Sequence, residues 1–167
     1  MGLPRNRHRA FTYRLAVVHL RPTLALVVVC GALVSGSAAA EATSTTALRL
    51  DGVPFRPELA LTPAQREVGL MRRLRAPTDG MLFVFPADTL DGFWMKNTLV
   101  PLTIVFFDEN GARVRKLSMT PCRTESCPVY YPRRLYRSAL ELPAADTRPA
   151  RTLGPLARLR RLAQRAT

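Results

Sequence analysis

Apolar and polar residues alternate along residues 47–61, with the period of two that is typical of half-buried strands. Asp51-Gly52 interrupts this alternation, and an Asp-Gly dipeptide favours the tight turn of a hairpin. Pro54 and Pro57 each lack a backbone donor, so the second half of the pattern is compatible only with the edge of a sheet. We therefore predict two short strands joined at Asp51-Gly52, with the second strand at an edge.

The residues that follow this hairpin predict a helix that begins at Thr62. Thr62 is a favoured N-cap, Pro63 suits the first helical position, and Gln65 can complete a capping box. We expect the helix to end near Met71. Its apolar face should consist of Ala64, Val68 and Met71.

Further apolar runs, separated by turn residues and prolines, predict strands at residues 81–85, 93–95, 102–107, 112–118 and 138–142. A segment rich in Pro, Ala and Arg follows, and the last residues then place Leu on one helical face and Arg on the others. We predict a mainly β single domain over residues 41–145, either a compact small barrel or a strongly bent antiparallel sheet with one short capped helix. Residues 146–167 are predicted to be a linker and a basic amphipathic C-terminal helix.

The first forty residues have the three-part pattern of a secretory signal. They contain five arginines and no acidic residue, then an uncharged apolar run over residues 23–34, then small residues up to Ala40. The apolar run is shorter than the roughly twenty residues of a membrane-spanning helix. We expect a signal peptide over residues 1–40 with cleavage near Ala40, and a periplasmic or secreted domain; retention as an uncleaved anchor stays open.

The net charge of +13 first suggests a nucleic-acid partner, but its distribution argues against one. Residues 1–40 contain five arginines and residues 148–167 contain six, without any acidic residue in either segment. The central part of the chain is nearly neutral. We expect no nucleic-acid partner, and membrane contact only through an uncleaved signal segment or the basic C-terminal helix.

Cys122 and Cys127 are the two cysteines outside the signal segment, and an oxidising compartment favours a disulfide between them. Both histidines, His8 and His19, lie within residues 1–40. The mature chain therefore cannot carry Ser-His-Asp or Cys-His catalysis or a histidine-ligated metal. We expect neither a metal site nor a cofactor.

The segment from Trp94 to Thr98 has the composition of a binding pocket, because large apolar residues run directly into an amine, an amide and a hydroxyl. Lys96 could bind a carboxylate or phosphate, Asn97 could orient a polar group, and Trp94 could stack on a sugar or planar ligand. The structural alternative is that Trp94 lies in the core, Lys96 pairs with Glu141, and Asn97 with Thr98 caps a turn.

Glu141 stands alone among apolar neighbours, and a strand buries such a carboxylate only with a partner. A pair of Lys96 with Glu141 would be either structural or an acid/base couple, and Arg66 on the capped helix could face the same opening. We expect an exported binding or accessory module with a small-ligand pocket near Lys96 and Asn97, and with a small ligand or an envelope protein as its partner. The alternative is a periplasmic enzyme of hydrolase or lyase type that uses Lys96 with Glu141 or Arg66.

Five ordered blocks of the chain carry a family resemblance: LTPAQREVGLM at 61–71, GMLFVF at 80–85, FWMKNTLVPLTIVFFDENG at 93–111, PCRTESCPVYY at 121–131 and ALEL at 139–142. Together they resemble the secreted prokaryotic family known as domain of unknown function 192. This resemblance implies a compact β-rich fold in an exported domain, and it implies no particular reaction. Family members commonly finish with a Gly-rich turn and a closing strand, whereas this chain continues into an Arg-rich helix.

Overall fold

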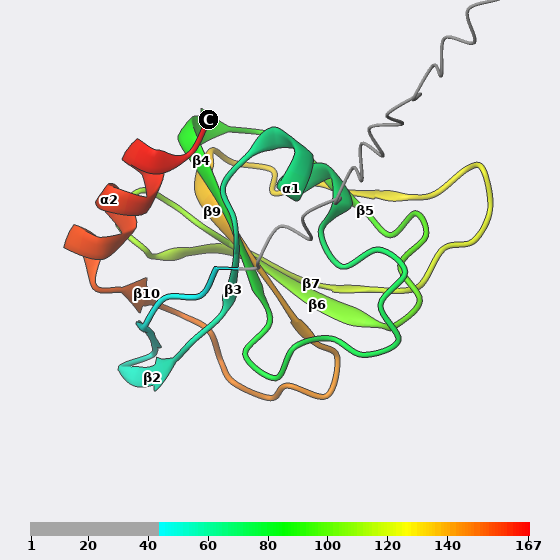
Figure 1. Cartoon of the computed structure of the whole chain (residues 1–167), viewed down its shortest axis with the longest axis horizontal. Coiled ribbons are helices and arrows are strands. Elements are labelled where there is room, and N and C mark those ends of the chain that lie inside the picture. The colour runs from blue at the N-terminus through cyan, green and yellow to red at the C-terminus, as the bar shows by residue number, and fades with distance from the viewer. Residues whose placement is uncertain (1–43) are drawn as a thin grey trace, which may run out of the picture. The chain divides into compact units, whose positions relative to one another are not determined.

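The computed structural model describes residues 44–167, which form a mainly β domain with two helices (Figure 1). The predicted signal peptide and its cleavage near Ala40 lie outside the described residues. Neither helix in residues 44–167 has the length and hydrophobicity needed to cross a membrane.

A central sheet of five strands organises the domain, in the order β3-β4-β9-β6-β7. The strands β3 and β4 are parallel, and every other neighbouring pair is antiparallel. All six residues of β6 are buried, as expected for a strand near the centre of a sheet that is covered on both faces. The strands are β3 (Glu58–Ala60), β4 (Met81–Thr89), β6 (Leu102–Phe107), β7 (Arg113–Met119) and β9 (Tyr136–Pro143).

Two smaller sheets flank the central one. The first has the order β10-β1-β2, from β1 (Leu48–Leu50), β2 (Val53–Phe55) and β10 (Leu153–Gly154). The second pairs β5 (Phe93–Trp94) with β8 (Val129–Tyr130). The predicted hairpin at Asp51-Gly52 is confirmed, since β1 and β2 are antiparallel neighbours. The proline-containing second half forms β2 and β3, both at sheet edges as predicted.

The sheets are bent, and in residues 44–167 they do not close into a barrel. The mainly β fold with a strongly bent sheet is therefore confirmed, and the small barrel is wrong. Closure would require pairing between the edge strands β3 and β7, and these are not hydrogen-bonded to each other. The parallel pairing of β3 with β4 is a further difference from the fully antiparallel sheet that the pattern predicted.

Helix α1 (Pro63–Val68) begins as predicted, with Thr62 and Gln65 forming a complete capping box. Its predicted apolar face is wrong, because Ala64 and Val68 are exposed and no residue of the helix is buried. The side chain of Arg66 instead attaches the helix to the sheet through the carbonyl oxygens of neighbouring segments. A six-residue helix held by its polar side does not need an apolar face.

Helix α2 (Leu156–Arg165) packs on the domain through Leu159, Leu162 and Ala163, next to β4 (Figure 1). The linker expected to precede it is not a free connection in the structure, because this stretch contains β10. The carboxylate of Asp51 accepts hydrogen bonds from the backbone amides of Arg151 and Thr152, at 2.7 and 2.9 Å. Asp51 therefore ties the end of the chain to the first hairpin.

Candidate functional site

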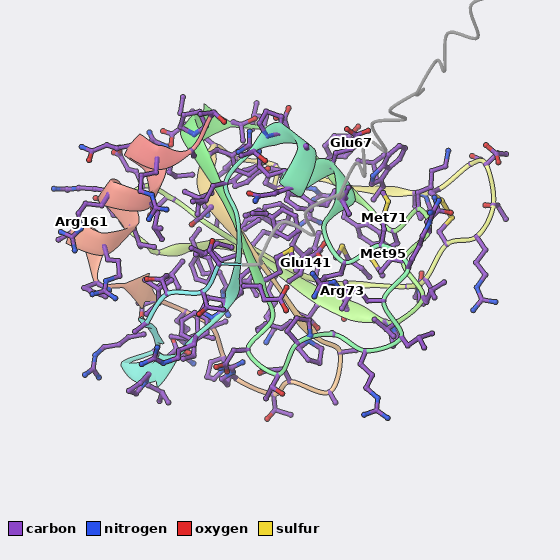
Figure 2. All side chains as sticks on the ribbon, in the orientation of Figure 1. Glu67, Met71, Arg73, Met95, Glu141 and Arg161 are labelled. Carbon is purple, nitrogen blue, oxygen red and sulfur yellow. A yellow bond between two sulfur atoms is a disulfide. The ribbon has the colours of Figure 1, made fainter. Side chains whose placement is uncertain are left out.

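Glu141 is the most unusual buried residue of the domain. It lies in the middle of β9, in register with Met81 of β4 and Ile104 of β6, and only 5% of its surface is exposed. Burial raises the pKa of its carboxyl to about 8. No hydrogen bond and no ion pair to this carboxyl is found among residues 44–167. In Figure 2 the Glu141 label lies over the packed middle of the domain.

A glycine brings the backbone of β4 close to this position. Gly80 precedes β4 with φ of +71°, and a Cβ atom there would overlap the carbonyl oxygen of Glu141. The turn at Pro77-Thr78-Asp79-Gly80 therefore has to end in glycine, because a side chain would push the start of β4 away from β9. Gly80, the last residue of this predicted turn, therefore allows β4 to start close to Glu141.

The Glu141 cavity is a space of about 30 Å³ beside this side chain. That volume is enough for about two water-sized groups, since roughly 10–15 Å³ accommodates one water. Thr98 is also buried there, and Phe83 and Phe93 contact each other edge to face with ring centroids 5.0 Å apart. The walls of the Glu141 cavity comprise Phe83, Phe93, Trp94, Thr98, Glu141 and the segment 66–71 at the end of α1.

A second, larger feature lies on the surface next to this cavity. The Trp94 groove has a volume of about 520 Å³ and contains four exposed apolar side chains together with Asp91 and Gly92. A Cβ atom on Gly92 would overlap the side chain of Val129, so glycine is needed for the loops to pack here. The exposed apolar residues of the groove are Leu90, Trp94, Val129 and Tyr131.

Trp94 joins the two features, because it lines both the Trp94 groove and the Glu141 cavity. Its position on β5 explains this: Phe93 packs against the core, and Trp94, the next residue, faces outward with 46% of its surface exposed. The expectation that Trp94 could be a core residue is therefore wrong. As an exposed aromatic ring it is available for stacking.

Lys96 does not pair with Glu141. Its Nζ atom lies 3.6 Å from an Oε atom of Glu125 and over the ring of Trp94, 5.6 Å from the ring centroid. The neighbouring Met95 points into the core, so Lys96 is directed away from it. Lys96 lines neither the Trp94 groove nor the Glu141 cavity.

Asn97 is placed in a turn by its backbone. It adopts φ of +56°, a conformation that asparagine tolerates better than most residues. Its backbone amide donates to the carbonyl of Cys122 at 3.1 Å, and its carbonyl accepts from Arg72 at 2.8 Å. Asn97 therefore holds a turn between two loops, and its side chain lines neither the groove nor the cavity.

Arg66 contributes to the walls of the Glu141 cavity, but its guanidinium is occupied by other groups. It donates to the carbonyl oxygens of Leu61 at 2.6 Å, Val84 at 3.1 Å and Thr167 at 2.6 Å. It also lies over the ring of Phe85, 4.9 Å from its centroid, and burial lowers its pKa. Of the expected site residues, the structure brings Arg66, Trp94 and Glu141 to one cavity and leaves Lys96 and Asn97 outside it.

The disulfide between Cys122 and Cys127 is confirmed, with Cα atoms 5.9 Å apart. It closes the loop that leads into β8 and so supports Val129, which pairs with Trp94 across the small sheet. Arg115 on β7 donates to the carbonyl oxygen of Tyr131 at 2.5 Å and fixes the other wall of the groove. Within residues 44–167, no cluster of three or more metal-binding side chains is present.

Sequence reasoning missed part of both features. Phe83 and Phe93 were expected only as strand residues, and Tyr131 had no assigned role, whereas Thr98 belonged to the predicted pocket segment. A local signal existed for Tyr131, because Val129 to Tyr131 are apolar or aromatic directly after a proline in a loop. Nothing local indicated that this loop pairs with β5.

The family model of DUF192, described as "Uncharacterized ACR", matches residues 46–152. The chain belongs to the DUF192 family. The matched residues contain the Trp94 groove, the Glu141 cavity and both cysteines of the disulfide, and they end before α2. The resemblance seen in the sequence is thereby confirmed. Among curated proteins, none matches this DUF192 chain.

Two crystal structures are similar to this DUF192 protein. One, from Sinorhizobium meliloti 1021, is described as a "putative transcription regulator" and is 28% identical to this chain. The match covers 67% of this chain and 94% of the Sinorhizobium chain, with a TM-score of 0.57. The other is a protein of unknown function from Novosphingobium aromaticivorans DSM 12444 that is 22% identical to this chain. The match covers 70% of this chain and 89% of the Novosphingobium chain, with a TM-score of 0.60. The second likeness shows the fold alone.

Proposed function

We propose that this protein is an exported binding module whose Trp94 groove binds a saccharide chain. The observation that carries the proposal is the exposure of Leu90, Trp94, Val129 and Tyr131 around one groove. Contiguous apolar side chains on a monomer surface mark an interaction site more often than scattered ones do. The proposed binding site is therefore this groove and not the pocket near Lys96 and Asn97 that the sequence suggested. Trp94 belongs to both.

The mixture of rings and charges supports a sugar as the occupant. Trp94 and Tyr131 offer flat faces on which the C–H side of a pyranose can stack, and both carry a polar group at one end. Asp91 lines the same groove and can accept hydrogen bonds from hydroxyl groups. The ammonium of Lys96 over Trp94 adds a donor at its edge. A sugar can use both the rings and the polar groups of the groove, whereas a purely apolar ligand can use the rings alone.

Export is supported by two independent features. Residues 1–40 have the charge and apolar pattern of a signal peptide, and the Cys122–Cys127 disulfide is typical of an oxidising compartment. On this proposal the mature protein works in the periplasm or outside the cell. Its partner is a saccharide of the envelope or the surroundings, alone or attached to an envelope protein.

Nucleic acid and membrane surfaces are less suitable partners. The residues that line the Trp94 groove include the acidic Asp91 and no lysine or arginine, whereas a nucleic-acid site presents basic side chains to the phosphates. Leu159, Leu162 and Ala163 of α2 pack into the domain, so the helix offers no continuous apolar face to a lipid surface. We therefore do not transfer the description of the Sinorhizobium protein to this chain.

The enzyme alternative loses the pair on which it depended. Lys96 contacts Glu125, and Arg66 is held by three carbonyl oxygens, so neither is positioned to exchange a proton with Glu141. A buried acid without a second catalytic group does not define a hydrolase or a lyase. The binding module is the better reading of the geometry.

The test uses the intrinsic fluorescence of Trp94, which is the only tryptophan of the chain. Mature protein is titrated with hexamers of β-1,4-linked glucose, β-1,4-linked N-acetylglucosamine and α-1,4-linked glucose. We expect a shift of Trp94 emission with at least one of them, and about tenfold weaker binding in Tyr131→Ala, because one stacking ring is lost.

The matched control is Val53→Ala, since Val53 is 58% exposed on β2 and Tyr131 is 56% exposed in the groove. This control should bind like the unmodified protein. If none of the saccharides changes the emission at millimolar concentration, the proposal is wrong. A response to a proline-rich peptide in their place would identify the groove as a peptide site.

A further inference from the structure

We propose that the Glu141 cavity is a binding site for a primary alkylammonium group, held by the Glu141 carboxylate among the rings of Phe83, Phe93 and Trp94. The inference goes beyond the function proposed above, because it concerns a different space and a different chemical group. It applies equally to a free amine and to the amino group of a longer molecule.

The first step is the missing partner of Glu141. Buried carboxylates in folded proteins are normally paired with a cation or with several hydrogen-bond donors. Glu141 is 95% buried, lines the cavity and has no such partner within residues 44–167, so the fold leaves a strong acceptor unused. A cation in the cavity would supply what the chain does not.

The second step is the chemistry of the other walls. Phe83, Phe93 and Trp94 are aromatic residues of the wall, and aromatic rings attract ammonium groups, as the Nζ atom of Lys96 over Trp94 illustrates at 5.6 Å from the ring centroid. The wall opposite Glu141's strand comes from the C-terminal end of α1, and helix C-termini carry partial negative charge. The hydroxyl of Thr98 can accept a hydrogen bond from an ammonium. Each of these walls favours a cation over an anion.

The third step is size. About 30 Å³ accommodates roughly two water-sized groups, which matches an ammonium group with its first carbon and is too small for a trimethylated ammonium. The cavity reaches the surface beside Glu67, Val68 and Trp94, which are exposed. An alkyl chain attached to the ammonium can leave the cavity there. In Figure 2, Glu67 lies on the outer side of α1.

The charged groups around the cavity are compatible with a cation. Besides Glu141, the charged wall residues are Arg66 and Glu67. The guanidinium of Arg66 donates to the carbonyls of Leu61, Val84 and Thr167, and it forms no ion pair with Glu141 within residues 44–167. Glu67 adds a negative charge at the entrance.

Binding of this kind must release a proton, because the free cavity holds Glu141 in its neutral form at pH 7. The balance is one carboxyl proton released for one ammonium bound. Affinity should therefore rise about tenfold per pH unit up to pH 8 and stay level until the amine itself loses its proton near pH 10. A ligand oxygen that accepts a hydrogen bond from the neutral acid would show the opposite trend above pH 8.

The experiment titrates the mature protein with methylammonium chloride and follows Trp94 emission, with sodium chloride at equal ionic strength as reference. We expect binding at pH 9 and about 100-fold weaker binding at pH 6. Calorimetry at pH 7 in two buffers of different ionisation enthalpy should show close to one proton released per methylammonium. Tetramethylammonium should bind at least tenfold more weakly, because it exceeds the cavity.

The decisive variant is Glu141→Gln, which should lose methylammonium binding, and the matched control is Glu125→Gln, which alters an exposed glutamate outside the cavity. Retained binding in Glu141→Gln, no binding by the unmodified protein at pH 9, or equal binding of tetramethylammonium would overturn the proposal. If Glu141→Gln does not fold, the pH profile and proton release of the unmodified protein decide. Tyr131→Ala separates this site from the groove, since it should weaken saccharide binding and leave methylammonium binding unchanged.

Discussion

The two faces of β9 are buried to nearly the same extent and differ in what they bury. On one face Leu140 and Leu142 pack in a continuous apolar core with Leu159 and Leu162 of α2. On the other face the side chain of Glu141 takes a position that an apolar residue could fill. Full burial of a leucine would contribute about 1.5–3 kcal/mol, whereas an unpartnered acid contributes none of this and has to stay protonated.

This difference is what the proposed amine site would explain. Stability alone would favour an apolar residue at both faces, so the stability cost at Glu141 is expected if that position serves binding. The same side of the domain carries the cavity, and the cavity shares Trp94 with the groove. On the α2 side, β9 buries Ser138 beside Leu140 and Leu142, but no carboxylate.

The largest expected effect is on the pH dependence of stability. The pKa of Glu141 is about 8 in the folded protein, against 4.5 for an ordinary glutamate, so the folded state binds one more proton between these values. The contribution of Glu141 to the free energy of unfolding should therefore be highest below pH 4.5 and fall as pH rises to 8, by about 1.4 kcal/mol per unit and about 5 kcal/mol in total.

Urea unfolding of the unmodified protein and of Glu141→Gln, from pH 5 to pH 8, measures this effect as the difference between the two curves. The other titrating groups are common to both proteins and cancel. Parallel curves would mean that Glu141 is ionised or paired in solution, and the contrast between the faces of β9 would then disappear.

The second effect tests the apolar face. Leu140→Ala removes a side chain that is fully buried opposite α2, and the cavity left behind should lower the free energy of unfolding by about 3 kcal/mol. Because no titrating group is added or lost, this loss should be the same at pH 5 and pH 8. A loss that changes with pH would show that the two faces are coupled through β9.

The sequence predicted the elements whose signals are local. The Asp51-Gly52 turn, the capping box at Thr62 and the Cys122–Cys127 disulfide each depend on residues within a few positions of one another, and all three are confirmed. The strand β10 was missed because its pairing with β1 joins residues about one hundred positions apart. The exposed face of α1 was missed because hydrophobic periodicity does not show that Arg66 attaches the helix through carbonyl oxygens.

The candidate site divides in the same way. Trp94 and Glu141 are local anomalies, an aromatic residue beside polar ones and a carboxylate among apolar ones, and both belong to the site. Their surroundings come from distant segments: Tyr131 reaches Trp94 through the β5–β8 pairing, and Phe83 lies on β4. Lys96 was considered as a partner for Glu141 because both are charged residues with apolar neighbours in the sequence. That pattern does not show how far apart the two side chains lie in the fold.

The smallest expected effect concerns Lys96, and it tests directly whether Lys96 and Glu141 are independent. Lys96 pairs at 3.6 Å with Glu125, an exposed residue, and exposed pairs contribute little, so Lys96→Ala should change the free energy of unfolding by no more than about 0.5 kcal/mol. The double variant Lys96→Ala, Glu141→Gln should equal the sum of the single variants to within about 0.5 kcal/mol, because residues without a shared contact act additively. A large loss in Lys96→Ala that the second change rescues would require a buried pair between the two residues. In that case Glu141 would already have its cation, and the cavity would have no need of an external one.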